Sequence, residues 1–391
     1  MLGSLYRYWL LLVLLVAPLQ GVWAAGVPVK VREPLTFKQV VGWADDDHAA
    51  ALVAFRQACA AAPGTGPESV RAGLKRICAL AKKLPDSDVH DRAKARGFFE
   101  THFLPFRVKN ADTDGLLTGY FEPELEGSLE PSKAFHVPVL KRPDDLVDVV
   151  AATDRAAANA QGRLASMRKS GNELSPYFTR AEIEGGALKA RGLELLYLRD
   201  AADAYFMHVQ GSGRIHLRDG KSVRIGYAGK NGYPYTSAGA VLISRGAIAR
   251  EDLTLQSMRA WFHAHPQETP GILQQNKSYI FFELKPAADH FTGPIGAQGT
   301  PLTPRRSLAV DPSFHVLGTP IFVSSETVQH GNTTGFHHLL IAQDVGSAIK
   351  GPERGDIFWG SGKAAEEIAG RTKNRGHFFV LLPKPDMPPA P

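Results

Sequence analysis

From Gly115 onward the chain is a series of short apolar runs separated by turn residues, and this pattern limits its fold more than any other feature. The 38 glycines and 27 prolines among 391 residues favour many turns over a helical bundle. The Asp219-Gly220 pair predicts a hairpin turn. The runs that predict strands are HVPVLK, AYFMHVQ, GRIHLRDGKSVRIGYAG, SYIFFEL, TPIFVSS, HHLLIAQD and HFFVLLP. We therefore expect a mainly β protein.

The region before Gly115 has helical periodicity instead. Its apolar side chains recur at spacings of three, four and seven residues: Leu52, Phe55 and Cys59, then Val70, Leu74 and Ile77. A third helix is predicted from about residue 89 to 103. We expect these helices to form a packing layer without chemistry of their own. One further amphipathic helix, with Leu255, Met258 and Phe262 on one face, interrupts the strand series.

The N-terminus has the pattern of an export signal. Arg7 precedes an apolar run from Trp9 to Val16, and the small residues Ala24 and Ala25 offer a cleavage site. The alternative is a retained membrane anchor, but the run is short for a span and is broken by Pro18. No cysteine follows the run closely, so lipid attachment is not expected. Residues 1–25 are predicted to be a signal peptide, and export to the periplasm follows.

Cys59 and Cys78 are the two cysteines of the sequence. In an exported protein such a pair most often forms a disulfide. On the chain-entropy model a loop of about twenty residues contributes roughly 3 kcal/mol. The alternative is a pair of buried thiols on helix faces. No CxxC motif indicates redox chemistry.

Composition and motif spacing disfavour several functional classes. A net charge of +6 suits an anionic polymer or membrane surface, whereas no basic run interleaved with aromatics indicates nucleic acid. No HExxH motif occurs, and the neighbours His337 and His338 point to opposite faces of a strand, so no metal site is expected. FWGSGKAAE lacks the first glycine and the Ser or Thr of a phosphate-binding loop. No cofactor is predicted.

Two aspartates carry the strongest chemical signal. Asp344 ends the HHLLIAQD run, and Asp356 is followed by Ile357, Phe358 and Trp359. Burial among apolar groups raises the pKa of a carboxylic acid, which can then donate a proton near neutral pH. The intervening glycine-rich turn could bring the two carboxylates together, with Lys350 nearby. The alternative is two unrelated turn-capping aspartates.

SAIK, residues 347–350, matches the SxxK signature of penicillin-binding acyl-enzymes. Its companion motifs are misplaced, and Gly351-Pro352 would end the helix that aligns Ser347 with Lys350. An acyl-enzyme is therefore a weaker hypothesis than acid catalysis.

These segments resemble those of the membrane-bound lytic murein transglycosylase A family and of the related three-aspartate (3D) domains. AVDPSFHVLGTPIFV supplies Asp311, AQDVGSAIKG supplies Asp344 and RGDIFWG supplies Asp356. LLTGYFEPELEGS, YFMHVQGSGRIHLRDG, GYAGKNGYPY with GAVLISRGAI, and NKSYIFFEL precede them in family order. The resemblance covers roughly residues 115–383.

The resemblance implies a double-psi β-barrel domain that is interrupted by a second, inserted β domain, with the substrate groove between them. The barrel would comprise residues 111–122 and 284–383, and the inserted domain residues 123–283. Residues 26–110 would be the helical region that packs on the barrel. Residues 384–391 are proline-rich and are predicted to be a disordered tail.

The resemblance also implies cleavage of the MurNAc–GlcNAc β-1,4 bond of peptidoglycan without water, leaving 1,6-anhydro-MurNAc ends. Asp356 would be the catalytic acid and Asp344 its auxiliary carboxylate. The expected partners are peptidoglycan glycan strands and other cell-wall enzymes. The expected location is the periplasm, with association with the outer membrane as a further expectation. Alternatives are a non-catalytic glycan-binding barrel and a hydrolase. The predicted groove residues are Thr118, Gly119, Tyr120, Gln210, Gly211, Ser212, Asp311 and Lys350.

Overall fold

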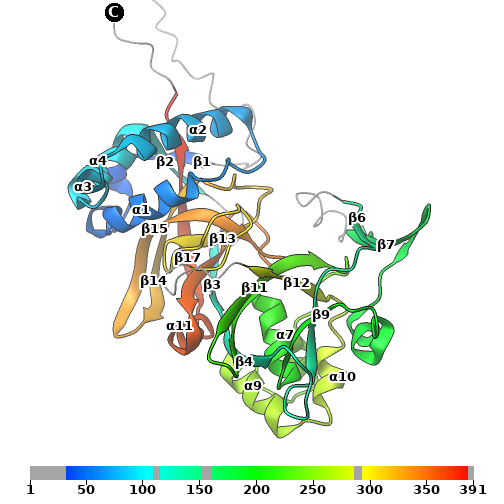
Figure 1. Ribbon diagram of the computed structural model, residues 1–391. Coiled ribbons are helices and arrows are strands. Elements are labelled where there is room, and N and C mark those ends of the chain that lie inside the picture. Colours follow the sequence, from blue (N-terminus) through cyan, green and yellow to red (C-terminus); the bar gives the residue numbers. More distant parts are fainter. Residues whose placement is uncertain (1–31, 109–114, 151–160, 286–292, 386–391) are drawn as a thin grey trace, which may run out of the picture.

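The computed structural model describes residues 32–108, 115–150, 161–285 and 293–385. Figure 1 shows three parts: a layer of helices, a β-barrel below it, and a second β lobe beside the barrel. The predicted signal, residues 1–25, and residues 386–391 of the predicted tail lie outside the described residues. Within the described ranges every helix is too short or too polar to serve as a transmembrane span.

Six strands form a closed barrel. Their order is β3-β17-β14-β15-β13-β16, and β16 pairs back to β3, which closes the ring. The pairs β13–β15 and β16–β3 are parallel, and the other four are antiparallel. The helix α11 (Gly362–Ala369) follows β16. The barrel strands are β3 (Gly115–Glu122), β13 (Ser307–Val310), β14 (Pro320–His330), β15 (Thr333–Val345), β16 (Arg354–Ser361) and β17 (Lys373–Pro383). The mainly β fold and the barrel expected from the sequence are confirmed.

The second lobe is inserted between β3 and β13. A six-stranded sheet of order β12-β11-β10-β4-β9-β5 forms its body, and a three-stranded sheet, β6-β7-β8, lies at its edge. Its strands are β4 (Glu124–Ser128), β5 (Val137–Leu140), β6 (Leu146–Asp148), β7 (Ser166–Ser170), β8 (Glu173–Pro176), β9 (Glu194–Leu198), β10 (Ser212–Leu217), β11 (Ser222–Lys230) and β12 (Ile280–Lys285). Its helices are α6 (Arg180–Glu182), α7 (Ala201–Gln210), α8 (Ala238–Ser244), α9 (Leu255–Ala264) and α10 (Thr269–Leu273), with a π-helical turn at Ile183–Ala187. The predicted hairpin at Asp219-Gly220 is confirmed by the antiparallel pairing of β10 with β11.

One expectation about this lobe is wrong, and one predicted boundary differs by two residues from the end of a strand. AYFMHVQ was expected to be a strand but lies in helix α7, which the Asp200 carboxylate caps by accepting from the backbone N–H groups of Ala202 and Asp203. The helix is buried on most of its surface, and a continuous apolar run cannot distinguish a buried helix from a buried strand. The predicted boundary at residue 284 falls inside β12, which pairs with β11 as far as Lys285. Leu284 and Lys285 therefore lie in the inserted sheet.

The N-terminal helices cover one outer face of the barrel (Figure 1). They are α1 (His48–Ala58), α2 (Glu68–Lys83), α3 (Asp86–Val89) and α4 (Arg92–His102), with 3₁₀ turns at Phe37–Gln39 and Trp43–Asp45. The short strand β1 (Arg32–Pro34) pairs with β2 (Phe103–Val108), and β2 pairs with β17. The chain therefore enters the barrel as an added edge of its sheet.

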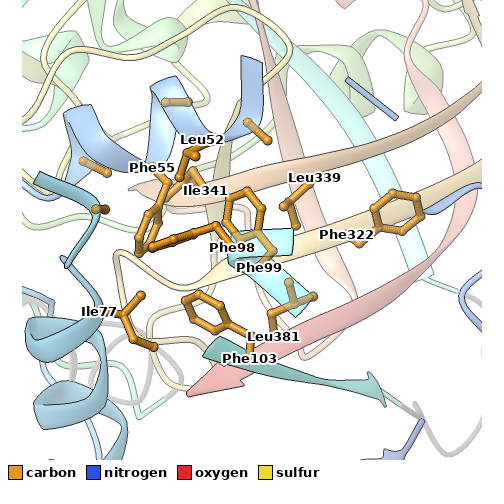
Figure 2. Close-up of a cluster of buried hydrophobic side chains, with 14 of the residues drawn as sticks. Leu52, Phe55, Ile77, Phe98, Phe99, Phe103, Phe322, Leu339, Ile341 and Leu381 are labelled. Carbon is orange, nitrogen blue, oxygen red and sulfur yellow. The ribbon is translucent and has the colours of Figure 1, made fainter. Parts of the chain in front are cut away.

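A continuous apolar core joins this layer to the barrel. Helix side chains such as Phe55, Ile77 and Phe99 pack against Phe322 and Leu381 of the barrel strands, and all five are buried (Figure 2). Burying one such side chain contributes about 1.5–3 kcal/mol. The helical layer is thus held mainly by the hydrophobic effect.

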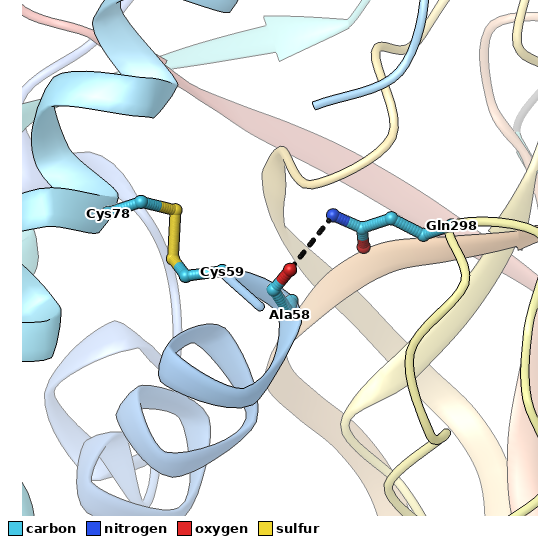
Figure 3. Close-up of a disulfide and its surroundings, with 4 residues drawn as sticks. All are labelled: Ala58, Cys59, Cys78 and Gln298. Atoms are coloured by element: carbon cyan, nitrogen blue, oxygen red, sulfur yellow. Dashed lines mark hydrogen bonds between the residues drawn. A yellow bond between two sulfur atoms is a disulfide. The ribbon is translucent and has the colours of Figure 1, made fainter. Parts of the chain in front are cut away.

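Cys59 and Cys78 form a disulfide between the end of α1 and α2 (Figure 3). Beside it, the Gln298 amide donates a hydrogen bond of 3.2 Å to the carbonyl oxygen of Ala58. Gln298 belongs to the segment that precedes β13. The end of α1 is therefore tied both to α2 and to a loop that leads to the barrel.

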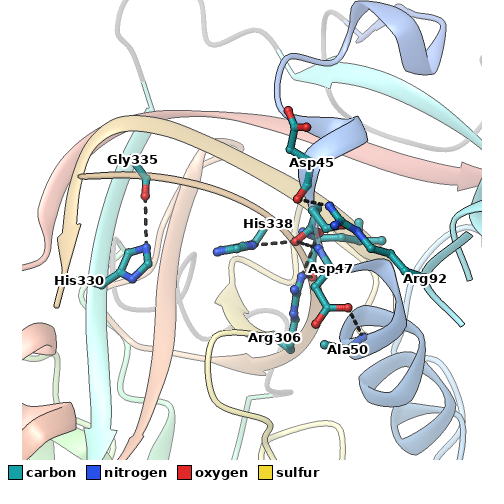
Figure 4. A network of polar contacts seen from close by, with 10 residues as sticks. Asp45, Asp47, Ala50, Arg92, Arg306, His330, Gly335 and His338 are labelled. Carbon is teal, nitrogen blue, oxygen red and sulfur yellow. Dashed lines mark hydrogen bonds and ion pairs between the residues drawn. The ribbon is translucent and has the colours of Figure 1, made fainter. Parts of the chain in front are cut away.

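Asp46 is buried and anchors the helical layer to the barrel through an ionic network with Arg306 and His338, two residues that Figure 4 labels. Its carboxylate accepts hydrogen bonds from Arg306 Nη1 at 2.9 Å, from His338 Nδ1 at 2.7 Å and from the backbone N–H of Leu339 at 2.7 Å. Burial acts to raise the pKa of Asp46, but His338 and Arg306 outweigh it and hold that pKa well below its usual range. The network fixes the start of β13 and the middle of β15.

Candidate active site

The barrel register brings the two predicted catalytic aspartates to one face. Ala309 of β13 pairs with Asp344 of β15 on one side and with Asp356 of β16 on the other. Asp356 in turn pairs with Thr118 of β3. With strands about 4.8 Å apart, the Cα atoms of Asp344 and Asp356 lie about 10 Å apart. Their side chains project from the outside of the barrel. Leu308 and Ile357, the sequence neighbours of Ala309 and Asp356, lie in the interior cluster, and a register shift between Ala342 and Asp344 places Asp344 opposite Ala309.

Asp356 lies half-buried on β16, where it pairs with Thr118 of β3 and shares its face of the strand with Arg354 and Phe358. Thr118 Oγ1 donates a hydrogen bond of 2.5 Å to Asp356 Oδ1. Phe358, two residues along the strand, is buried and packs on Tyr120 with ring centroids 5.3 Å apart. Burial raises the pKa of Asp356; Arg354 and the Thr118 hydrogen bond oppose this rise, and the Asp344 charge adds to it. The net rise lets this carboxyl keep its proton to higher pH than an ordinary aspartic acid.

Asp344 is held by three hydrogen-bond donors. The backbone N–H groups of Ala297 and Val345 each donate to Oδ1 at 2.9 Å, and Tyr120 Oη donates to Oδ2 at 2.9 Å. Burial raises the pKa of Asp344 above its usual range, and these three hydrogen bonds oppose the rise without cancelling it. Three donors favour the ionised form of Asp344, whereas Asp356 accepts one side-chain hydrogen bond, so the two carboxyl groups have contrasting surroundings.

Asp311 and Lys350 lie at the adjoining end of the site. Asp311 is only 4% exposed and accepts hydrogen bonds from the backbone N–H groups of Ser313 and Gly351. Lys350 Nζ lies 3.9 Å from Asp311 Oδ1, while the lysine side chain remains 44% exposed. Asp311 thus holds the loop that links Asp344 to Asp356. A contact of either residue with substrate stays a prediction.

The SxxK serine and lysine have different partners. Ser347 Oγ accepts a hydrogen bond of 3.3 Å from Lys230 Nζ, whereas Lys350 faces Asp311. Both residues lie outside any helix, in the segment between β15 and β16. The geometry therefore gives no support to an acyl-enzyme at Ser347.

The remaining predicted residues divide between two sides of β3. Thr118 and Tyr120 face the carboxylates, whereas a Cβ added at Gly119 would lie 2.4 Å from Trp359 Nε1. Gly119 is therefore required for packing behind the strand. On that side, Gln210 Oε1 accepts from the backbone N–H of Phe121 at 3.1 Å and lines a cavity of about 150 Å³ between the two lobes.

Gly211 and Ser212 have backbone roles in the structure. Gly211 ends α7 with φ of 79°, a conformation that favours glycine. Ser212, 8% exposed, begins β10 opposite Gly226. Of the VQGSG motif, Gln210 is the residue whose side chain reaches β3.

Sequence reasoning missed two contributors to the site. Ala297 acts through its backbone N–H, which carries no side-chain signal. Arg354 is two residues before Asp356 on the same strand, and the alternation of side chains along a strand could have identified it. No group of three or more His, Cys, Asp or Glu side chains that could hold a metal ion occurs among the residues that the structure describes.

Two family models match the chain. The MltA specific insert domain matches residues 116–283, and the 3D domain matches residues 306–382. The first range covers β3 apart from Gly115 and the inserted lobe apart from Leu284 and Lys285. The second covers β13 to β17 apart from the last residue of β17. Together they include Thr118, Asp311, Asp344 and Asp356.

Individual relatives agree with these matches. The membrane-bound lytic murein transglycosylase A of Vibrio cholerae is 35% identical over 272 residues, which are 68% of this chain and 65% of that protein. Its Escherichia coli counterpart is 33% identical over 287 residues, which are 72% of this chain and 69% of that protein. The E. coli protein has also been solved with bound chitohexaose; that structure has a TM-score of 0.63 at 27% identity and covers 92% of this chain and 93% of its own.

The structure of the membrane-bound lytic murein transglycosylase of Agrobacterium tumefaciens is similar over almost its whole length. It has a TM-score of 0.79 at 35% identity, and the match covers 90% of this chain and 97% of that one. Sequence, barrel topology and inserted lobe lead to one assignment. The chain belongs to the membrane-bound lytic murein transglycosylase A family.

Proposed function

We propose that the protein is a lytic transglycosylase that cleaves the MurNAc–GlcNAc β-1,4 bond of peptidoglycan and leaves 1,6-anhydro-MurNAc ends, with Asp356 as its single general acid/base. The observation that carries this proposal is the pairing of two half-buried carboxyl groups in contrasting surroundings. Three hydrogen-bond donors to Asp344 stabilise its ionised form. Asp356 accepts from one donor and has the apolar Phe358 two residues along its strand, which favours its protonated form.

The first half of the reaction is bond cleavage. The Asp356 carboxyl donates its proton to the glycosidic oxygen while the C1–O bond breaks and its electron pair passes to that oxygen. Positive charge develops at C1 and the ring oxygen. Asp344, whose ionised form accepts hydrogen bonds from Tyr120, Ala297 and Val345, lies across β13 and stabilises this charge.

The second half is ring closure within the substrate. The ionised Asp356 takes the proton of the muramoyl C6 hydroxyl as its oxygen attacks C1. Asp356 is then protonated again, so one group completes the cycle and no activated water is needed. Because the nucleophile belongs to the substrate, a second catalytic base is not required.

Mass spectrometry of digested peptidoglycan tests the proposal. The purified protein should release muropeptides that end in anhydro-MurNAc and are lighter by one water than hydrolysis products. Reducing MurNAc ends would indicate a hydrolase instead. Binding to peptidoglycan without any release would indicate the non-catalytic, glycan-binding barrel.

A Tyr120→Phe variant is expected to slow release of anhydro ends about 10-fold, because it removes one hydrogen bond to an ionised group. Its ring would still pack on Phe358, so folding should be retained. Initial rates on isolated peptidoglycan measure the effect. Tyr197→Phe, in β9 of the inserted lobe, is the matched control. Equal rates for the two variants would contradict the role assigned to the Tyr120 hydroxyl.

We also propose that the protein is exported and works in the periplasm, where peptidoglycan lies. The sequence of residues 1–25 and the membrane-bound character in the names of its relatives support an envelope location. N-terminal sequencing of the mature protein from a periplasmic extract tests the cleavage site at Ala24 or Ala25. Association with the outer membrane and with other cell-wall enzymes stays a prediction.

A further inference from the structure

We propose that Arg354 is a positioning residue for the reaction: its guanidinium stabilises the carboxylate that Asp356 becomes after giving up its proton. The inference rests on the proposed function and adds to it a residue outside the predicted catalytic and groove set. It concerns the state between the two proton transfers, when Asp356 carries a negative charge beside a second carboxylate.

Strand geometry places Arg354 next to Asp356. The two residues are separated by Gly355 on β16, so their side chains project from the same face. In the parallel register with β3, Arg354 lies opposite Leu116 and Asp356 lies opposite Thr118. Both side chains are half-buried, so each keeps some contact with solvent.

Backbone carbonyl groups hold the guanidinium in this place. Arg354 Nη1 donates to the carbonyl oxygen of Gly355 at 2.6 Å and makes a longer contact of 3.5 Å with that of Leu116. Because a guanidinium has five N–H donors, anchoring by Nη1 leaves capacity for a further acceptor. The arginine is therefore a fixed cation and not a freely moving surface side chain.

The charges around Asp356 explain why a cation is needed there. Asp344 approaches from β15 across β13, Thr118 and Tyr120 face the site from β3, and Arg354 precedes Asp356 on β16. Burial and the Asp344 charge raise the pKa of Asp356, and Arg354 is the cation that opposes them. Without this cation, burial and the nearby Asp344 charge would destabilise the ionised form of Asp356, and loss of its proton would become less favourable.

Arg354 contributes differently to the two protonation states of Asp356. Its positive charge stabilises the ionised Asp356 more than the protonated form, and so lowers the energy of the step in which the proton leaves. The proton itself goes to the glycosidic oxygen and returns from the C6 hydroxyl, so Arg354 neither gains nor loses one. Its guanidinium stays charged throughout.

The test compares Arg354→Gln and Arg354→Lys with Arg371→Gln, an exposed arginine near the end of α11, as the control. Two readouts are measured on each folded variant: the pH profile of anhydro-end release, and the ¹³C carboxyl shift of Asp356 during a pH titration, assigned by its loss in Asp356→Asn. Thermal melting confirms that each variant is folded. The carboxyl titration needs no activity, so it remains decisive if the proposed function fails.

In Arg354→Gln we expect the Asp356 titration midpoint and the alkaline limb of the rate profile to rise together, by about one pH unit or more. The plateau rate should fall about 10- to 100-fold, with a much smaller change in KM. Arg354→Lys should restore the midpoint, and Arg371→Gln should leave both readouts unchanged.

Two results would overturn the inference. One is an unchanged Asp356 midpoint in folded Arg354→Gln, whatever happens to the rate. The other is an equal shift in Arg354→Lys and Arg354→Gln, because retention of the charge would then have no effect. A wild-type protein without anhydro products would overturn the proposed function alone, and the carboxyl titration would still decide whether Arg354 stabilises the Asp356 anion.

Discussion

Asp356→Asn is expected to reduce the release of anhydro-MurNAc ends by at least about 10³-fold, because one group serves both proton transfers and an amide can serve neither. The substitution keeps the size of the side chain, and Thr118 Oγ1 can still donate to the amide oxygen. Folding should therefore be unchanged. The measurement is product mass spectrometry on equal amounts of variant and wild type, with thermal melting in parallel.

Asp144→Asn, at an exposed loop position of the inserted lobe, is the matched control and should retain full activity. Asp344→Asn should lose less than Asp356→Asn, because it removes charge stabilisation but leaves the proton donor in place. The opposite order of losses would assign the acid to Asp344. Undiminished release by Asp356→Asn would refute the mechanism.

The second large effect is on stability. Asp46→Asn is expected to lower the free energy of unfolding by about 3–5 kcal/mol at pH 7, because it leaves Arg306 buried without its countercharge. Denaturant unfolding measures the change. The exposed neighbour Asp45 offers a matched control, since Asp45→Asn should stay within about 0.5 kcal/mol of wild type. Similar stabilities for the two variants would contradict the anchoring role of Asp46.

The pH dependence gives this prediction a second test. The pKa of Asp46 in the folded protein lies well below its value in the unfolded chain, about 3.9. Its stabilisation is therefore present above about pH 4 and is lost as the pH falls toward the folded pKa. The gap in stability between wild type and Asp46→Asn should narrow on acidification from pH 6 to pH 3. A constant gap would show that charge is not its origin.

The sequence predicted most elements because their patterns are local. Leu52, Phe55 and Val70 recur at helical spacing, and all three are buried in the core beneath the N-terminal helices. Likewise the segments TPIFVSS and HHLLIAQD contain apolar runs of the length of a strand. They form β14 and β15, respectively. The strand predicted for AYFMHVQ was wrong because the helix is buried on most of its surface, so its apolar residues show no helical periodicity. Asp200 before the run and Gly211 after it are helix caps, and they were the signal to use.

The sequence predicted which residue types form the candidate site, but it did not predict most of the contacts between them. Asp344 and Asp356 stood out because a carboxyl next to large apolar residues is unusual, and the ordered motifs indicated the family. The partners of these carboxylates come from distant segments: Thr118 and Tyr120 lie more than 220 residues before them in sequence. Ala297 contributes a backbone N–H, which any residue except proline could supply.

The sequence by itself determined which groups could carry the chemistry: an acid with apolar neighbours, a second carboxylate and a glycine-rich turn between them. It also determined the helical layer and most strands, because these depend on the spacing of apolar side chains over short stretches of sequence. Only the tertiary structure decided that Ala309 separates the two aspartates, that Tyr120 and Ala297 donate hydrogen bonds to Asp344, and that Arg354 shares the face of Asp356. The physical reason is that protonation depends on burial and on charges within a few ångströms, and closure of the barrel determines which distant segments supply them.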